Sequence, residues 1–245
     1  EHIIKCKNAT NKPFAVNLPL LYPNAEDHIN SIINLEVPIV FTSAGNPKTW
    51  TQKLQSNGIK VIHVVSSVKF ALKAEQAGVD AVVAEGFEAG GHNGIEETTT
   101  FCLIPDVANA ISVPLIAAGG IVDGKSMLAA MVLGADAVQM GTRFVASQES
   151  SAHENFKQRV LNTEEGETKL TLKEITPVRM IKNEFYNEID SLYNINASVE
   201  ELKNKLGRGR AKKGMFEGDL KEGELEIGQA ASQLTEVLPA AEIIG

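Results

Sequence analysis

The residues of this chain that are best suited to chemistry lie together in the segment VVAEGFEAGGHNG, residues 82–94. An apolar run leads into Glu85, and His92 follows among four glycines. Glycine at this density is used where the backbone approaches something closely, because a side chain would be in the way. An imidazole changes its charge near neutral pH, which makes His92 a candidate general base. The segment therefore predicts a ligand site with a base beside it.

Other interpretations of the same segment stay open from the residues alone. His92 could simply brace its loop through a hydrogen bond. A metal site would recruit Glu88, Glu96 and Glu97, but a glycine-rich segment is a poor scaffold for ligands, and we expect no metal. Glu85 ends a buried run, where an ionised carboxylate needs a partner. It could accept hydrogen bonds from a ligand, or pair with a lysine or arginine for structural reasons.

The other histidines are weaker candidates. His63 lies at the end of another apolar run and could line the same pocket. We expect His2 and His28 on the surface, and His153 on a polar helix.

Short apolar runs alternate with helical patterns along the first part of the chain. A helical segment such as 67–78 separates successive runs, and this alternation is typical of a parallel sheet with crossover helices. The runs that predict strands are 13–19, 38–43, 60–65, 80–86, 114–120 and 136–142.

An internal repeat favours a closed barrel over an open sheet. AGVDAVVAEG and LGADAVQMG share the pattern Gly-x-Asp-Ala-Val, and their glycines, Gly78 and Gly134, are 56 residues apart. This spacing equals two βα units of about 28 residues, which suits a (β/α)8 TIM-type barrel of about 250 residues. A doubly wound open sheet is the competitor, but its G-x-G-x-x-G fingerprint is absent.

Six strands are two fewer than such a barrel needs. We expect its first two strands to lie upstream of this sequence; alternatively, two weak strands escape detection or the sheet is open. We assign residues 1–150 to the barrel core, strands three to eight. Residues 151–245 are charged and helix-prone, and predict a helical segment and a C-terminal tail that packs on the barrel.

Two glycine-containing loops follow the last two predicted strands. AAGGIVDGKS contains Gly120, and QMGTRF contains Gly141 and Thr142. The loops after strands seven and eight of a barrel commonly bind phosphate, since glycines expose backbone amides and a helix N-terminus follows. We therefore expect a phosphate site here; the alternative is a pair of tight turns.

Composition excludes several classes of protein. The net charge of −8 argues against general nucleic-acid binding, and no apolar run approaches the roughly 20 residues that a membrane span requires. The basic stretch GRGRAKKG, residues 207–214, is interpreted as a solvated loop. Cys6 and Cys102 lack metal-type spacing, and we expect reduced thiols in a cytoplasmic protein.

The segments AEGFEAGGHNG, IPDVANAISVPLIAAGGIVDGKSMLAA and LGADAVQMGTRFVASQES closely resemble the nitronate monooxygenase (2-nitropropane dioxygenase) family. That family includes flavin-dependent enoyl-ACP reductases with the same loops. The similarity is dense over residues 61–150, and MFEGDLKEGELEIGQ resembles the family's tail. The resemblance implies an FMN-binding (β/α)8 barrel with a small helical domain.

The resemblance also implies roles for particular residues. His92 corresponds to the histidine of the family's Gly-Gly-His motif and becomes the presumed catalytic base. The phosphate-binding positions fall on Gly120, Gly141 and Thr142. The flavin contacts fall on Asn17, Glu85, Gly90, Gln139 and Met140.

This sequence departs from the family pattern at two places. The amino-terminal strand with a Pro-Met-Ala-type flavin contact has no counterpart. Some members carry lysine after the histidine of the fifth strand, whereas here Val64 follows His63. The departure puts in doubt how the reduced flavin would be stabilised.

The resemblance implies oxidation of nitronates or nitroalkanes by O2 with FMN, a small-molecule substrate and His92 as base. The alternative is an enoyl-ACP reductase that uses NAD(P)H and docks an acyl carrier protein. A non-oxidative isomerase or lyase on the same barrel is a third class. We expect no nucleic-acid or membrane partner, and a homodimer is compatible with the sequence.

Overall fold

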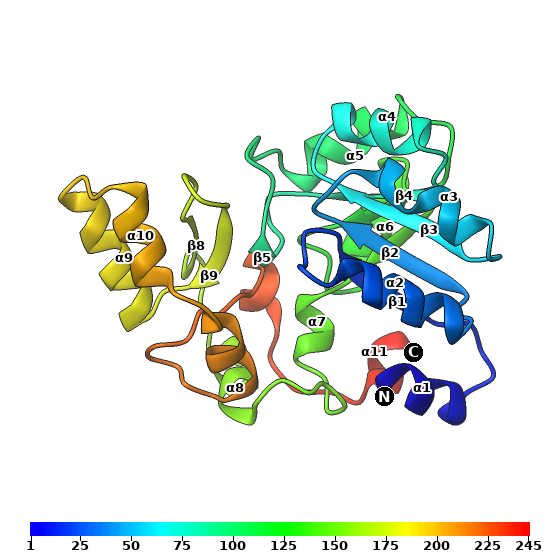
Figure 1. The fold of residues 1–245 in the computed structure, drawn as a ribbon. Helices are drawn as coiled ribbons and strands as arrows, with labels where there is room; N and C mark the ends of the chain where they lie inside the picture. Colours follow the sequence, from blue (N-terminus) through cyan, green and yellow to red (C-terminus); the bar gives the residue numbers. More distant parts are fainter.

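The computed structural model describes residues 1–245, and its larger part is a six-stranded sheet in which all neighbouring strands are parallel (Figure 1). The strand order β1-β2-β3-β4-β6-β7 follows the sequence. Each strand lies within one of the six predicted runs. The strands are β1 (Ala15–Pro19), β2 (Ile39–Ser43), β3 (Lys60–Val65), β4 (Ala81–Glu85), β6 (Leu115–Ala118) and β7 (Ala137–Gln139).

The strand order distinguishes between the two predicted architectures. A doubly wound sheet reverses its order at a switch point, whereas the wall of a barrel adds strands in sequence. The sheet here is curled and adds strands in sequence, so it is a half-barrel. β1 and β7 each have only one neighbour in it, so the six strands that were predicted form part of a barrel wall and not a closed ring.

Helices between the strands cover the outer face of the half-barrel (Figure 1). They bury a core of aliphatic side chains such as Val40, Val61, Val82 and Leu115 against the strands, as expected where both faces of a parallel sheet are covered. None of the helices is both long and apolar enough to cross a membrane. The elements are α1 (His2–Ala9), α2 (Ala25–Asn34), η1 (Pro47–Thr49), α3 (Thr51–Gln55), α4 (Val68–Gln76), α5 (Thr100–Ala108) and α6 (Gly124–Val132).

The C-terminal region contains a second sheet as well as the predicted helices. β5 (Gly91–His92) pairs antiparallel with β9 (Val178–Ile181), which pairs with β8 (Thr168–Thr171). The sequence patterns predicted a helical segment here but not these strands, because β8 and β9 have only four residues each and lie between charged helices. The other elements are α7 (Thr142–Val145), α8 (Glu154–Leu161), α9 (Glu184–Asn194), α10 (Val199–Leu206), η2 (Lys212–Phe216), η3 (Gln229–Gln233) and α11 (Ala240–Ile244).

A segment near the C-terminus, residues 224–229, joins the two sheets, and we call it the strap. Leu225 O accepts a hydrogen bond from Ile181 N of β9, at 2.9 Å. On the half-barrel side, Gln229 N donates to Glu88 O, also at 2.9 Å. Leu225 and Ile227 are buried in a second apolar core with Phe156 of α8. The strap therefore fixes the C-terminal region against the loop that follows β4.

Candidate active site

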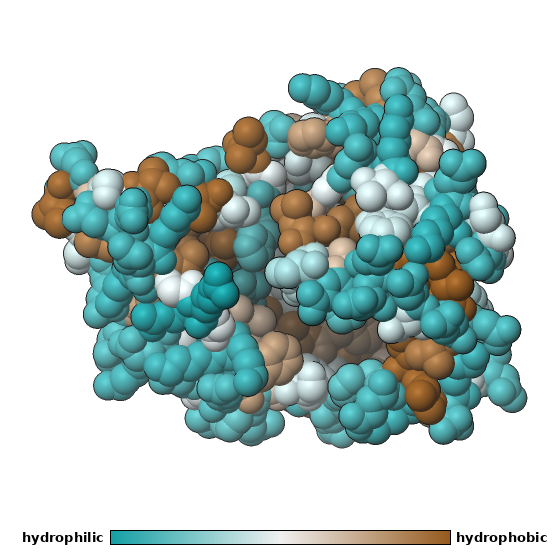
Figure 2. Space-filling view, in the orientation of Figure 1, coloured by the Kyte–Doolittle hydropathy of each residue, from teal (hydrophilic) through white to brown (hydrophobic).

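Two connected cavities lie at the carboxyl ends of the parallel strands, where barrel enzymes place their active sites. The inner cavity has a volume of about 150 Å³ and the outer cavity about 890 Å³. Both are lined by Glu85, Gly90, Gln139 and Gly141, so they form one cleft. The outer cavity lies within the range of about 300–1,000 Å³ that is usual for small-molecule sites. Figure 2 shows this face of the molecule hollowed between the half-barrel and the C-terminal region.

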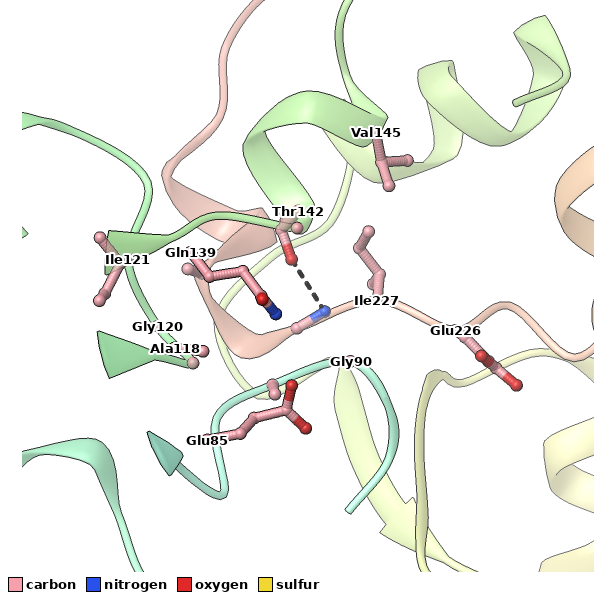
Figure 3. A pocket seen from close by; sticks show the side chains of 15 residues that line it. Glu85, Gly90, Ala118, Gly120, Ile121, Gln139, Thr142, Val145, Glu226 and Ile227 are labelled. Atoms are coloured by element: carbon pink, nitrogen blue, oxygen red, sulfur yellow. Dashed lines mark hydrogen bonds between the residues drawn. The ribbon is translucent and has the colours of Figure 1, made fainter. Parts of the chain in front are cut away.

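The inner cavity collects the residues that were predicted to bind phosphate. Gly120 follows β6, and Gly141 and Thr142 lie at the start of α7 (Figure 3). The strap closes the cavity with Ile227 and Gly228. Gly228 N donates to Thr142 Oγ1 at 3.2 Å, so the threonine hydroxyl oxygen already accepts a hydrogen bond from the strap.

The backbone amides of this cavity suit an anion. The N–H groups of Gly120, Gly141 and Thr142 donate no hydrogen bond to any other group of the chain. A Cβ built on Gly141 would meet no atom within 4 Å, so the space that a side chain would occupy at this position is open. No lysine or arginine lines the cavity. A phosphate group fits this donor set, since free amides and open space are what it requires.

The outer cavity is lined by the side chains that could take part in catalysis. It is lined by the predicted residues Asn17, His92 and Met140, and by His63. Lys73 of α4 is the only lysine or arginine on its wall, and no carboxylate lies within ion-pair distance of it. Three exposed apolar residues also line this cavity: Leu21, Tyr22 and Phe70.

His92 lies on a short strand rather than in a free loop, which corrects the sequence interpretation. It pairs with Val178 of β9. The preceding turn is held by Asn93, whose Nδ2 donates to Ala89 O at 2.9 Å. It is also held by Arg179, whose Nε donates to Phe87 O at 3.1 Å. The C-terminal sheet thus positions the imidazole at the half-barrel's cleft.

The glycines around His92 serve packing within the protein, a role that the sequence interpretation did not include. A Cβ on Gly90 would lie 2.6 Å from Ile227 Cα of the strap. A Cβ on Gly94 would collide with the side chain of Ser66. Gly91 has a φ of +74°, a conformation that other residues rarely adopt. Gly90 still lines both cavities, so a ligand contact there remains compatible with this packing.

Glu85 ends β4 and faces both cavities. Its carboxyl has no hydrogen bond or ion pair within the chain, so the structural pairing considered from sequence is absent. Burial raises the pKa of Glu85 to about 7. The group therefore changes between a neutral hydrogen-bond donor and an anionic acceptor near physiological pH.

His63 is buried within β3, and its Nδ1 lies 2.7 Å from Thr42 Oγ1 of β2. Burial, with a smaller contribution from the charge of Lys73, lowers the pKa of His63 to about 4. The imidazole is therefore neutral at physiological pH. His153, predicted on a polar helix, instead caps the start of α8 by accepting a hydrogen bond from Asn155 N.

Sequence reasoning missed the strap and Lys73 as parts of the cleft. Glu226, Ile227 and Gly228 line the inner cavity, although they lie more than 80 residues beyond Thr142. The only signal for them was the likeness of MFEGDLKEGELEIGQ to a family tail. Lys73 lies within an amphipathic helix and carries no signal in its sequence context.

The chain is similar to known proteins along nearly its whole length. The sequence profile described as nitronate monooxygenase matches residues 26–245. A "Probable nitronate monooxygenase" of Staphylococcus aureus (strain MSSA476) is 36% identical over 227 residues, covering 89% of this chain and 63% of that protein. One from Staphylococcus saprophyticus is 39% identical over 204 residues, covering 77% of this chain and 57% of the relative. The chain thus spans about half to two thirds of the length of these relatives.

Two solved structures superpose on almost the whole chain. FabK from Thermotoga maritima has a TM-score of 0.93 and 42% identity, with coverage of 99% of this chain and 76% of FabK. A nitroalkane oxidase from Streptomyces ansochromogenes has a TM-score of 0.82 and 26% identity, with coverage of 99% and 81%.

Proposed function

Because the chain belongs to the nitronate monooxygenase family, we propose that it is an FMN-dependent oxidoreductase of nitronates and their parent nitroalkanes. The observation that carries the proposal is the joining of two kinds of site in one cleft. The inner cavity offers free amides for a phosphate, and the outer cavity holds His92. A bare phosphate site would suit many ligands, and it is the family that points to a flavin.

The residues present fit FMN by the chemistry of their donors. Gly120, Gly141 and Thr142 would hold the phosphate through their amides. When bound, FMN supplies the electron-transfer chemistry of the reaction. The contacts to its ring system would come from Asn17, Glu85, Gly90, Gln139 and Met140, all of which line the cleft.

The proton chemistry falls to His92 in this proposal. Neutral imidazole takes a proton from the carbon next to the nitro group: a C–H bond breaks, an N–H bond forms, and the electron pair stays on the resulting nitronate. His63 is a poor alternative base, because a group whose pKa is about 4 binds a proton weakly at physiological pH. Lys73 gives the outer cavity a positive charge that favours an anionic nitronate.

The structural likeness to FabK keeps a second candidate open, an FMN-dependent enoyl-ACP reductase that uses NAD(P)H. Such an enzyme must dock an acidic carrier, and the basic stretch 207–214 is the part of the chain whose charge would suit it. Ion pairs largely neutralise that stretch. Its pairs are Arg210–Glu222 at 2.8 Å, Lys212–Glu217 at 3.2 Å and Lys213–Asp219 at 3.1 Å.

Two measurements test the proposal. The purified protein, incubated with FMN and then desalted, should retain flavin absorption bands, whereas an isomerase or lyase would not. Stopped-flow reduction should then be fast with a nitronate and slow with NADH. Fast reduction by NADH alone would instead support the enoyl reductase.

A further inference from the structure

Thr100, the first residue of α5, lies against the turn that follows β6 and outside both cavities. Its hydroxyl oxygen lies 2.8 Å from Gly119 O, 3.3 Å from Ala118 O and 2.9 Å from Glu88 Oε2. The backbone of Gly86 packs closely on it, since a Cβ built on Gly86 would collide with Thr100 Oγ1. Neither the family resemblance nor the proposed flavin contacts give this threonine a role.

The hydrogen of the Thr100 hydroxyl has three oxygen atoms within reach, but a hydroxyl donates only one hydrogen bond. Glu88 Oε2 already accepts from Thr100 N at 2.9 Å. Ala118 O already accepts from Gly86 N, also at 2.9 Å. Gly119 O is the nearest of the three and accepts no hydrogen bond from any other group of the chain. The hydroxyl therefore donates to Gly119 O, and the Glu88 carboxylate holds the threonine through its backbone N–H.

This hydrogen bond fixes the direction of the peptide group between Gly119 and Gly120. All peptide bonds of the chain are trans, and in a trans peptide the C=O and the next N–H point in opposite directions. Because Gly119 O is directed at Thr100, the N–H of Gly120 points away from α5. Gly120 lines the inner cavity, and its N–H has no partner within the chain. The free amide is thus directed at the inner cavity.

Two successive glycines leave this peptide group free to rotate unless another group holds it. The φ values of Gly119 and Gly120 are +94° and +72°, and neither residue has a Cβ that would oppose rotation of the peptide plane. A rotated peptide would present the partial negative charge of Gly119 O to the cavity. The wall of that cavity already carries Glu85 and Glu226 and no cation, so a phosphate would then be repelled.

We propose that Thr100 is a positioning residue, which holds the peptide between Gly119 and Gly120 with its N–H directed at a bound phosphate. The proposal rests on the phosphate site of the proposed function. Glu88 supports this arrangement twice: its carboxylate accepts from Thr100 N, and its backbone O accepts from Gln229 N of the strap at 2.9 Å. The phosphate-binding turn is thereby connected through α5 to the segment that closes the inner cavity.

Flavin affinity tests the proposal in the intact chain, with FMN and riboflavin as probes, because riboflavin lacks the phosphate. Thr100→Val keeps the shape of the side chain but removes the hydroxyl, and should weaken FMN binding by about tenfold with riboflavin binding unchanged. Thr100→Ser restores the hydroxyl and should bind FMN as the unmodified chain does. Thr99→Val is the matched control, since Thr99 is exposed and its side chain does not cap the helix. Unchanged FMN affinity in Thr100→Val, or equal losses for FMN and riboflavin, would overturn the proposal.

Titration with inorganic phosphate, followed by NMR of the backbone amides, separates the role of Thr100 from the phosphate site itself. In the unmodified chain, the amide resonances of Gly120, Gly141 and Thr142 should shift as phosphate is added. In Thr100→Val, and in the smaller Thr100→Ala, the Gly120 shift should disappear while those of Gly141 and Thr142 remain. A normal Gly120 response in both variants would overturn the role of Thr100 alone. No response of the three amides in the unmodified chain would reject the phosphate site, and both proposals with it.

Discussion

The inner and outer cavities of the cleft recognise ligands in different ways. The inner cavity presents backbone amides and glycines beside the carboxyl groups of Glu85 and Glu226, with no cation on its wall. The outer cavity presents ionisable side chains, two histidines and one lysine, beside exposed apolar residues. Backbone groups are fixed by the fold and do not titrate, whereas side chains change charge with pH and are easily substituted. The first cavity is therefore suited to holding a constant group and the second to chemistry.

The largest effect should come from the outer cavity. His92→Asn should reduce the turnover of a neutral nitroalkane by roughly 10²- to 10⁴-fold, the usual contribution of a positioned acid–base group. Steady-state oxygen consumption measures this loss. In the unmodified chain, the same rate should rise with pH, because only the neutral imidazole accepts a proton.

A substrate comparison within the same variant provides the control. A preformed nitronate has already lost its proton, so His92→Asn should slow its oxidation far less. If the turnover of both substrates fell equally and flavin retention also fell, His92 would be bracing its loop and not acting as a base.

FMN retention in the inner cavity should depend on the volume of the side chains on its wall and not on their charge. Gly141→Val should weaken FMN retention by roughly 100-fold, because the branched side chain enters the open space where the phosphate would lie. Gly124→Val is the matched control: its Cβ also meets no atom within 4 Å, but it lies outside both cavities. Gly120 is a poorer probe, since its φ of +72° would strain any replacement. FMN fluorescence titration measures both variants, and equal affinities would remove the phosphate assignment.

Glu85 lines both cavities, and its ionisation should affect the stability of the folded chain. Its pKa of about 7 in the folded chain lies above the ordinary value of about 4.3, so folding takes up a proton. The free energy of unfolding should therefore fall as pH rises between these two values. Glu85→Gln should raise it by roughly 2 kcal/mol at about pH 8, and by much less at about pH 4. Urea unfolding at both pH values measures this, and exposed Glu26→Gln should show no such dependence.

The smallest effect should come from Lys73 at the outer cavity. Lys73→Gln should raise KM for an anionic nitronate by about threefold, since an exposed charge is screened by water and salt. The effect should shrink at high ionic strength, and neutral nitroalkanes should be unaffected. Lys69 lies on the same helix outside both cavities and provides the control. Equal changes for both substrates would show that Lys73 does not act through its charge.

The two regions also differ in how far sequence could predict them. The half-barrel follows from local patterns: apolar runs of six or seven residues, strand-ending polar residues and a repeated Gly-x-Asp-Ala-Val. These patterns placed Glu85, Gly120, Gly141 and Thr142 on one edge of a sheet, because parallel strands share their carboxyl ends. The structure places all nine predicted site residues on the walls of the cleft. Their individual roles remain predictions.

The second sheet and the strap could not be predicted in this way. β5 has two residues, too few for any period to show. Its pairing with β9 and the close packing of the strap around Gly90 depend on segments far apart in sequence, and single-sequence patterns carry no information on such pairings. The glycines marked the location of the cleft, and in the structure they also make room for the strap and Ser66, neither of which is visible from the segment itself.

The strap has a consequence for the order in which the site can form. The hydrogen bond from Gly228 to Thr142 spans 86 residues, and the one from Arg179 to Phe87 spans 92. Contacts of such long range form late, because the intervening chain must first be ordered. A growing polypeptide can therefore assemble its half-barrel while the wall of the cleft is still being synthesised. Capture of the proposed FMN should then follow synthesis of the strap, because the inner cavity lacks one wall until the strap is in place.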